Sequence, residues 1–171
     1  SNLKFVAESL GGEHQYDAAL RSIDFAAELA PLCAAHMQGP KLGVSKTPLP
    51  VGLETFTILD GLAATGLSRP DWTAENVDWW RKQITHLPAD LVIGECAPRA
   101  MLAARSLGVP CVAISSGFFV LPPGYRPPAA SEEVEAARRG LVEAVAAAMS
   151  RFGGPAIDHL ADIVASDLDV V

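Results

Sequence analysis

Clusters of basic residues are scarce in this 171-residue sequence. The formal net charge is −7, and the only adjacent basic pairs are Arg81-Lys82 and Arg138-Arg139. Nucleic acids and anionic membrane surfaces are bound by concentrated basic faces. We therefore expect neither among the partners of this protein.

Cysteine is also rare, with three residues in the whole chain, an odd number that favours a reducing compartment. Cys96 follows one predicted strand and Cys111 opens the next, which separates them by roughly 16 Å across a parallel sheet and excludes a disulfide. Neither has a second Cys or a His at ligand spacing, so we expect no zinc or other metal site.

Long apolar runs and phosphate-binding turns are missing as well. No apolar segment reaches the length of a membrane span and no signal peptide is recognisable, so we expect a cytoplasmic protein without a membrane span. No Gly-rich turn of the dinucleotide-binding kind occurs, and Gly11-Gly12-Glu13 is a weak substitute for one. We expect no bound cofactor.

What the sequence does contain is typical of a globular domain. Half of its residues are apolar and 19% are charged, and 171 residues suffice for one domain with a sizeable core. We therefore expect a single domain over residues 1–171.

Residues 89–117 form the most informative segment, because they predict a strand, a helix and a second strand. Leu91–Ile93 is an unbroken apolar run, typical of a strand covered on both faces. Pro98 suits the first turn of a helix that Gly108 ends, and Val112–Ile114 is the second strand. The fold class is therefore α/β, a Rossmann-like parallel sheet flanked by helices.

The remaining elements are expected from periodicity, caps and chain breakers. They are a strand at 3–7, a helix at 16–30, a loop at 38–50, helices at 53–62 and 72–87 with Thr73 as the cap of the second, a non-helical segment at 121–128, a helix capped by Ser131, a short helix from Pro155 to Ile163 and a strand beginning at Leu168. In the helix after Ser131 the apolar stripe runs from Val134 to Ala148 and leaves Arg138 and Arg139 outside it.

The order of these pieces resembles a known family. The sequence Leu91-Val92-Ile93-Gly94-Glu95-Cys96-Ala97-Pro98, the later Ser106-Leu107-Gly108-Val109-Pro110, the upstream Trp79-Trp80-Arg81 and the downstream 117–123 are similar to the amino-terminal, acceptor-binding domain of bacterial glycosyltransferases of the two-Rossmann-domain (GT-B) type. The likeness is good from about Gly61 to Gly124 and thin elsewhere.

The resemblance implies transfer of a sugar from a nucleotide diphosphate sugar to a hydroxyl of a lipophilic small molecule. Such a reaction needs a general base, a His in the relatives, oriented by a carboxylate at a strand end. Glu95 stands where the relatives have an Asp, and His14 is the candidate base. The candidate acceptor-binding residues are Ser115, Ser116, Gly117, Phe118, Phe119 and Leu121.

Each of these residues also has a structural interpretation. Glu95 can cap the following helix, His14 can be a surface-loop residue, the serines can satisfy their turn, and one of the two phenylalanines can pack under the Pro-rich loop. The second class of function is a non-catalytic module that binds a small molecule or a partner. A stand-alone flavodoxin-like domain is disfavoured by the missing phosphate loop.

The family's donor-binding domain has no counterpart in residues 1–171, so the nucleotide sugar is expected to bind through a domain absent from this chain. We expect a domain truncated at its carboxyl end and a chain that is inactive in isolation. The amino-terminal strand is either the family's second strand, which leaves the first strand missing, or its first strand, in which case Gly11-Gly12-Glu13-His14 is a degenerate His turn.

Overall fold

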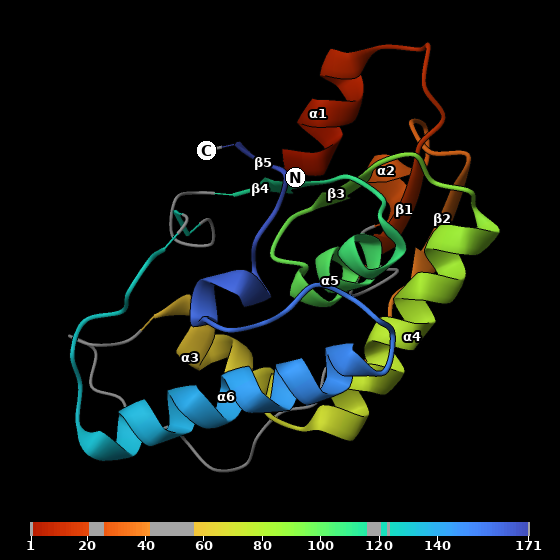
Figure 1. Ribbon diagram of the computed structural model, residues 1–171. Helices are drawn as coiled ribbons and strands as arrows, with labels where there is room; N and C mark the ends of the chain where they lie inside the picture. Colours follow the sequence, from red (N-terminus) through yellow and green to blue (C-terminus); the bar gives the residue numbers. More distant parts are fainter. Residues whose placement is uncertain (1, 21–25, 42–56, 116–120, 123, 171) are drawn as a thin grey trace. The chain divides into compact units, whose positions relative to one another are not determined.

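The computed structural model describes residues 2–20, 26–41, 57–115, 121–122 and 124–170 of the chain (Figure 1). The chain forms two compact units, residues 1–41 and 42–171. The fold is mixed α/β, with parallel strands in two small sheets flanked by helices, and is consistent with a Rossmann-like arrangement. The predicted fold class is confirmed.

The amino-terminal unit contains α1 (Asn2–Leu10), β1 (Asp17–Leu20), α2 (Ala26–Leu29) and β2 (Ala35–Gln38). β1 and β2 pair in parallel, with Asp17 opposite Ala35. Two sequence predictions are wrong here: residues 3–7 are helical, and the helix expected over 16–30 contains β1. Short apolar runs do not distinguish helix from strand by periodicity. The strand forms because its backbone groups pair with those of β2. Local propensity does not include this pairing, because β2 lies later in the chain.

The carboxyl-terminal unit contains the predicted strand-helix-strand segment. Its sheet consists of β3 (Val92–Gly94), β4 (Cys111–Ile114) and β5 (Leu168–Val170) in the order β3-β4-β5, all parallel. In register, Val92 lies opposite Cys111 and Val112 opposite Leu168. The strand predicted to begin at Leu168 is therefore confirmed as the neighbour of β4. Its apolar residues predict a buried strand, and this part is wrong, because Leu168 and Val170 are exposed.

The helices of this unit are α3 (Ile58–Leu62), α4 (Pro70–His86), α5 (Pro98–Leu107) and α6 (Glu132–Ser150), with a π-helical turn at Ala63–Leu67 and a 3₁₀ turn at Leu160–Ile163. The helix expected from Pro155 is reduced to that 3₁₀ turn. α4 begins at Pro70, so Thr73 is not its cap. The Thr73 side chain is buried inside the helix, and its hydroxyl donates to the Leu67 carbonyl oxygen at 3.1 Å.

Two predicted helix ends are confirmed. α5 stops at Gly108, whose φ of 71° is the left-handed conformation that glycine adopts without strain. α6 starts at Ser131, whose hydroxyl accepts a hydrogen bond from the Val134 N–H at 3.4 Å. The described part of the Pro-rich segment 121–130 contains no helix, as expected from its prolines.

The core of the carboxyl-terminal unit lies among α4, α5, α6 and the sheet. α4 packs against both α5 and α6, and α5 lies on the sheet strands β3 and β4 (Figure 1). The largest fully buried apolar side chains come from these elements and from α3 and the π and 3₁₀ turns, namely Leu59, Leu67, Val77, Leu102, Cys111, Val134, Leu141, Val145, Met149 and Ile163. This packing holds the ends of β3 and β4 in fixed positions.

Gly66 supplies the first test of this packing. Its φ is 89°, and a Cβ atom placed on it would lie 1.9 Å from the Trp72 ring. We expect Gly66→Ala to lower the free energy of unfolding by about 3 kcal/mol, because it combines a left-handed alanine with an overpacked contact. Urea denaturation measures the loss. Gly140→Ala on α6, where nothing lies within 4 Å of the added Cβ, is the control and should be neutral or stabilising.

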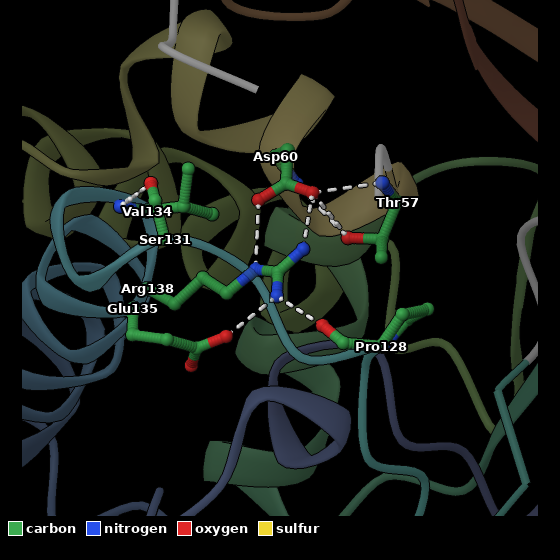
Figure 2. Close-up of polar contacts among 7 residues, drawn as sticks. All are labelled: Thr57, Asp60, Pro128, Ser131, Val134, Glu135 and Arg138. Carbon is green, nitrogen blue, oxygen red and sulfur yellow. Dashed lines mark hydrogen bonds and ion pairs between the residues drawn. The ribbon is translucent and has the colours of Figure 1, made fainter. Parts of the chain in front are cut away.

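A buried ion pair joins α3 to α6. Arg138 is only 3% exposed, although the helical stripe predicted it to lie outside the core. Its Nε and Nη2 atoms each donate to Asp60, both at 3.1 Å, and its Nη1 donates to Glu135 and to the Pro128 carbonyl oxygen, both at 3.0 Å (Figure 2). The guanidinium is accommodated in the interior because most of its N–H groups have acceptors.

Asp60 completes this cluster at the start of α3. Its carboxylate accepts hydrogen bonds from the backbone N–H of Thr57 at 2.7 Å and from the Thr57 hydroxyl at 2.8 Å (Figure 2). The backbone N–H of Asp60 donates in turn to the Thr57 hydroxyl oxygen at 3.4 Å, and this bond together with the one from the Thr57 N–H makes a capping box. Burial would raise the pKa of Asp60, but the hydrogen bonds from Arg138 and Thr57 together with the charge of Arg138 lower it below its ordinary value of 3.8.

The lowered pKa of Asp60 predicts an acid-dependent stability. A carboxyl whose folded pKa is depressed stabilises the fold at pH values above its unfolded pKa, and that contribution is lost as the pH falls through the lower folded pKa. The difference in unfolding free energy between the wild type and Asp60→Asn should therefore be constant above about pH 5 and shrink below about pH 4. Urea denaturation across pH 3–7 measures it. A difference that grows on acidification would contradict the assignment.

Candidate functional site

The candidate site lies at the carboxyl edge of the β3-β4-β5 sheet. Glu95 directly follows β3 and Ser115 directly follows β4. Because these strands are parallel neighbours with Gly94 opposite Ala113, the two residues lie at the same edge. The strand-helix-strand segment predicts that Glu95, Ser115 and Phe118 share this edge and border one cleft. The strand pairing confirms the shared edge for Glu95 and Ser115, whereas Phe118 lies outside the described residues. The carboxyl ends of strands are where open parallel sheets bind ligands.

Cys96 lies between Glu95 and α5 in an unusual backbone conformation. Its φ is 50°, and it is the one non-glycine residue with a positive φ among the described residues. Cys96 is exposed overall, yet partial removal of its thiol from solvent raises the pKa, the charge of Glu95 raises it further, and a hydrogen bond with Ser115 partly opposes them, giving a pKa of about 11. Glu95, Cys96 and Ser115 therefore interact at this edge, and the thiol is protonated at neutral pH.

A small cavity opens beside these residues. Its volume is about 20 Å³, and its lining includes Ile58, Leu62, Cys96, Met101, Ser115 and Val164. Such a volume holds about one water molecule. Among the described residues, this edge offers polar groups next to an apolar wall.

Glu95 does not occupy the N-cap position of α5. The N-cap position belongs to Ala97, which has no side-chain hydrogen-bonding group, and the first turn of α5 contains no acidic residue. Glu95 is half-buried and lies two residues before that cap. The helix-cap interpretation of Glu95 therefore has no support from the assigned cap.

Arg99 is a residue of this region that the sequence analysis missed. It lies in the first turn of α5 and is 4% exposed, and one of its guanidinium nitrogens donates to the Thr65 carbonyl oxygen at 2.6 Å. The guanidinium carbon lies 5.8 Å from the centroid of the Trp72 ring. Burial lowers the pKa of Arg99 to about 10, so it stays charged at neutral pH. No local pattern marks it, because its partners are distant in sequence.

His14 belongs to the amino-terminal unit and lies in the turn between α1 and β1. It precedes a strand, whereas the sequence analysis placed it before a helix. Its side chain is exposed, and its ring meets Tyr16 edge-on with the centroids 6.3 Å apart. Since residues 3–7 are helical, neither alternative for an amino-terminal strand there holds.

The remaining predicted acceptor-binding residues are described only in part. Ser116, Gly117, Phe118 and Phe119 lie outside the described residues. Leu121 is half-buried and packs against the core of the carboxyl-terminal unit. Its predicted contact with an acceptor stays a prediction.

The described residues contain neither a cluster of metal-ligating side chains nor a membrane-spanning helix. In the described ranges, no three His, Cys, Asp or Glu side chains come together as a metal-binding group. None of the helices described is both long and apolar enough to span a bilayer.

Comparisons with known proteins complete the description. We compared the chain with models of protein families, with curated proteins and with solved structures, and none of the three comparisons finds a match.

Proposed function

We propose that this chain is the acceptor-binding half of a glycosyltransferase that moves a sugar from a nucleotide diphosphate sugar to a hydroxyl of a lipophilic small molecule. The observation that supports it is the placement of Glu95 and Ser115 at one carboxyl edge of a parallel sheet. The order of sequence motifs around this edge is the second support.

The proposed chemistry assigns a role to each of these groups. A general-base imidazole takes the proton of the acceptor hydroxyl, the resulting oxygen nucleophile attacks the anomeric carbon, and the nucleotide diphosphate leaves. Glu95 orients that imidazole and stabilises its positive charge, as a carboxylate does when it accepts the other ring N–H. Ser115 holds the acceptor hydroxyl in position. The nucleotide sugar binds through a further domain.

Calorimetry tests the acceptor-binding half of this proposal. 7-Hydroxyflavone, a lipophilic compound with one hydroxyl, should bind the 171-residue chain, whereas UDP and TDP should not. Ser115→Ala should weaken flavone binding by roughly threefold to tenfold, because it removes one hydrogen bond. The control is Ser150→Ala at the exposed end of α6, which should bind like the wild type.

Two outcomes would contradict the proposal. The first is saturable micromolar binding of UDP or TDP, which would place a nucleotide site in this chain. The second is equal flavone affinity in the Ser115 and Ser150 variants, which would move acceptor binding away from the sheet edge.

A further inference from the structure

A second concave site lies in the carboxyl-terminal unit and shares no lining residue with the sheet-edge cavity. It is a groove of about 700 Å³ between three segments, residues 124–127, one face of α6 and residues 157–160. Its volume is within the range of about 300–1,000 Å³ typical of sites for drug-sized molecules. We refer to it as the α6 groove.

The lining of the α6 groove is polar toward the start of α6 and apolar toward its end. Glu135, Arg139, Val142 and Ala146 recur at spacings of three and four residues, so they form one stripe along α6. The stripe begins polar and ends apolar, with Val142 and Ala146 half-buried at the groove. Ile157 and Leu160 close the opposite side and are buried.

The wall formed by residues 124–127 is held by the buried Arg138. The Nη1 atom of Arg138 donates to the carbonyl oxygen of Pro128, directly after this wall, at 3.0 Å (Figure 2). The same guanidinium is fixed by the carboxylates of Asp60 and Glu135. One side chain thus ties the Pro-rich segment to α6, and the groove between them keeps its width.

The charges around the α6 groove cancel. Its exposed lining carries two arginines and two carboxylates, namely Arg126, Arg139, Glu143 and Asp158, while Arg138 is buried and paired with Asp60 and Glu135. An ion entering the groove loses hydration, and on this rim it meets charges of its own sign as well as charges of the opposite sign. A hydroxyl group, by contrast, can accept from an arginine or donate to a carboxylate, and a carbonyl group can accept from an arginine.

We propose that the α6 groove binds an uncharged lipophilic small molecule that carries a hydroxyl or carbonyl group. The apolar part of the lining takes the body of the molecule, and the rim hydrogen-bonds its polar end. The inference does not depend on the proposed sugar transfer, because it rests on the shape and charge of this groove alone.

Fluorescence titration with pyrenebutanol tests the proposal, since this probe has an apolar body and one hydroxyl. Saturable binding of one equivalent is expected for the wild type. Ala146→Trp fills the groove and should weaken binding at least tenfold. Ala147→Trp, at the next position of α6 but exposed and outside the groove lining, should bind like the wild type. Ser115→Ala at the sheet edge should also leave binding unchanged.

Charged analogues test the chemical class. Pyrenebutanoate and pyrenebutylammonium should both bind at least tenfold more weakly than the alcohol, because neither finds a net opposite charge. Val142→Lys, which makes the groove cationic, should weaken the alcohol and strengthen the carboxylate relative to it. This variant keeps the proposal testable if Ala146→Trp fails to fold, which a thermal melt reveals. The proposal is overturned if pyrenebutanol does not saturate the wild type, if Ala146→Trp and Ala147→Trp act equally, or if an ionic analogue binds as tightly as the alcohol.

Discussion

Replacing Arg138 by methionine should lower the free energy of unfolding by about 3–5 kcal/mol, the scale seen when one partner of a buried ion pair is removed. The Asp60 carboxylate is 4% exposed, so it would lose two hydrogen-bond donors and remain buried without replacement by water. The Pro128 carbonyl oxygen would lose its donor as well. Methionine keeps much of the side-chain volume, so the loss reports the polar contacts rather than a cavity.

Urea denaturation measures this loss, and the neighbouring Arg139 provides a matched control. Arg139 is exposed, so Arg139→Met should change the unfolding free energy by no more than about 0.5 kcal/mol. The double variant Arg138→Met with Asp60→Asn should lose less than the sum of the two single variants, because the second change removes the stranded charge. Additive losses, or equal losses at the two arginines, would show that the buried pair is not coupled.

Under the proposed sugar transfer, Glu95→Gln in the intact protein should lower turnover by about 100-fold while acceptor binding and the fold are kept, because the general base would lose the carboxylate that orients it and balances its charge. The measurement is the rate constant at saturating 7-hydroxyflavone with UDP-glucose or TDP-glucose as donor. Glu75→Gln on α4 is the control, since Glu75 is exposed and far from the β3 end in sequence.

The pattern of the kinetic effect separates the two classes of function. A fall in turnover with an unchanged Michaelis constant for the acceptor indicates a role in the transition state. Unchanged turnover in Glu95→Gln, with full activity in the control, would show that Glu95 has only a structural role. If the intact protein transfers no sugar but binds the flavone, the non-catalytic binding module is the better description.

Several features of this fold are predictable from the sequence because their causes are local. Gly108 ends α5 because it adopts a positive φ without strain, and Ser131 starts α6 because its hydroxyl satisfies a backbone donor three residues later. The segment 89–114 was predicted nearly residue by residue, since the apolar runs, Pro98 and Gly108 all agree. The edge that carries Glu95 and Ser115 follows from that segment.

The features that the sequence did not determine depend on partners distant in the chain. Residues 17–20 are a strand because β2 pairs with them, and alanines there favour a helix when judged alone. Arg138 falls beside the apolar stripe of α6, and its burial depends above all on Asp60, 78 residues earlier, which accepts from two of its nitrogens. The α6 groove likewise needs the Pro-rich segment and residues 157–160 to lie against one helix. Helix caps, breakers and buried strand runs act within a few residues and can be recognised in the sequence. The pairing of strands, the burial of a charge and the shape of a groove are decided by the tertiary structure, because their energy comes from contacts between segments that local patterns do not connect.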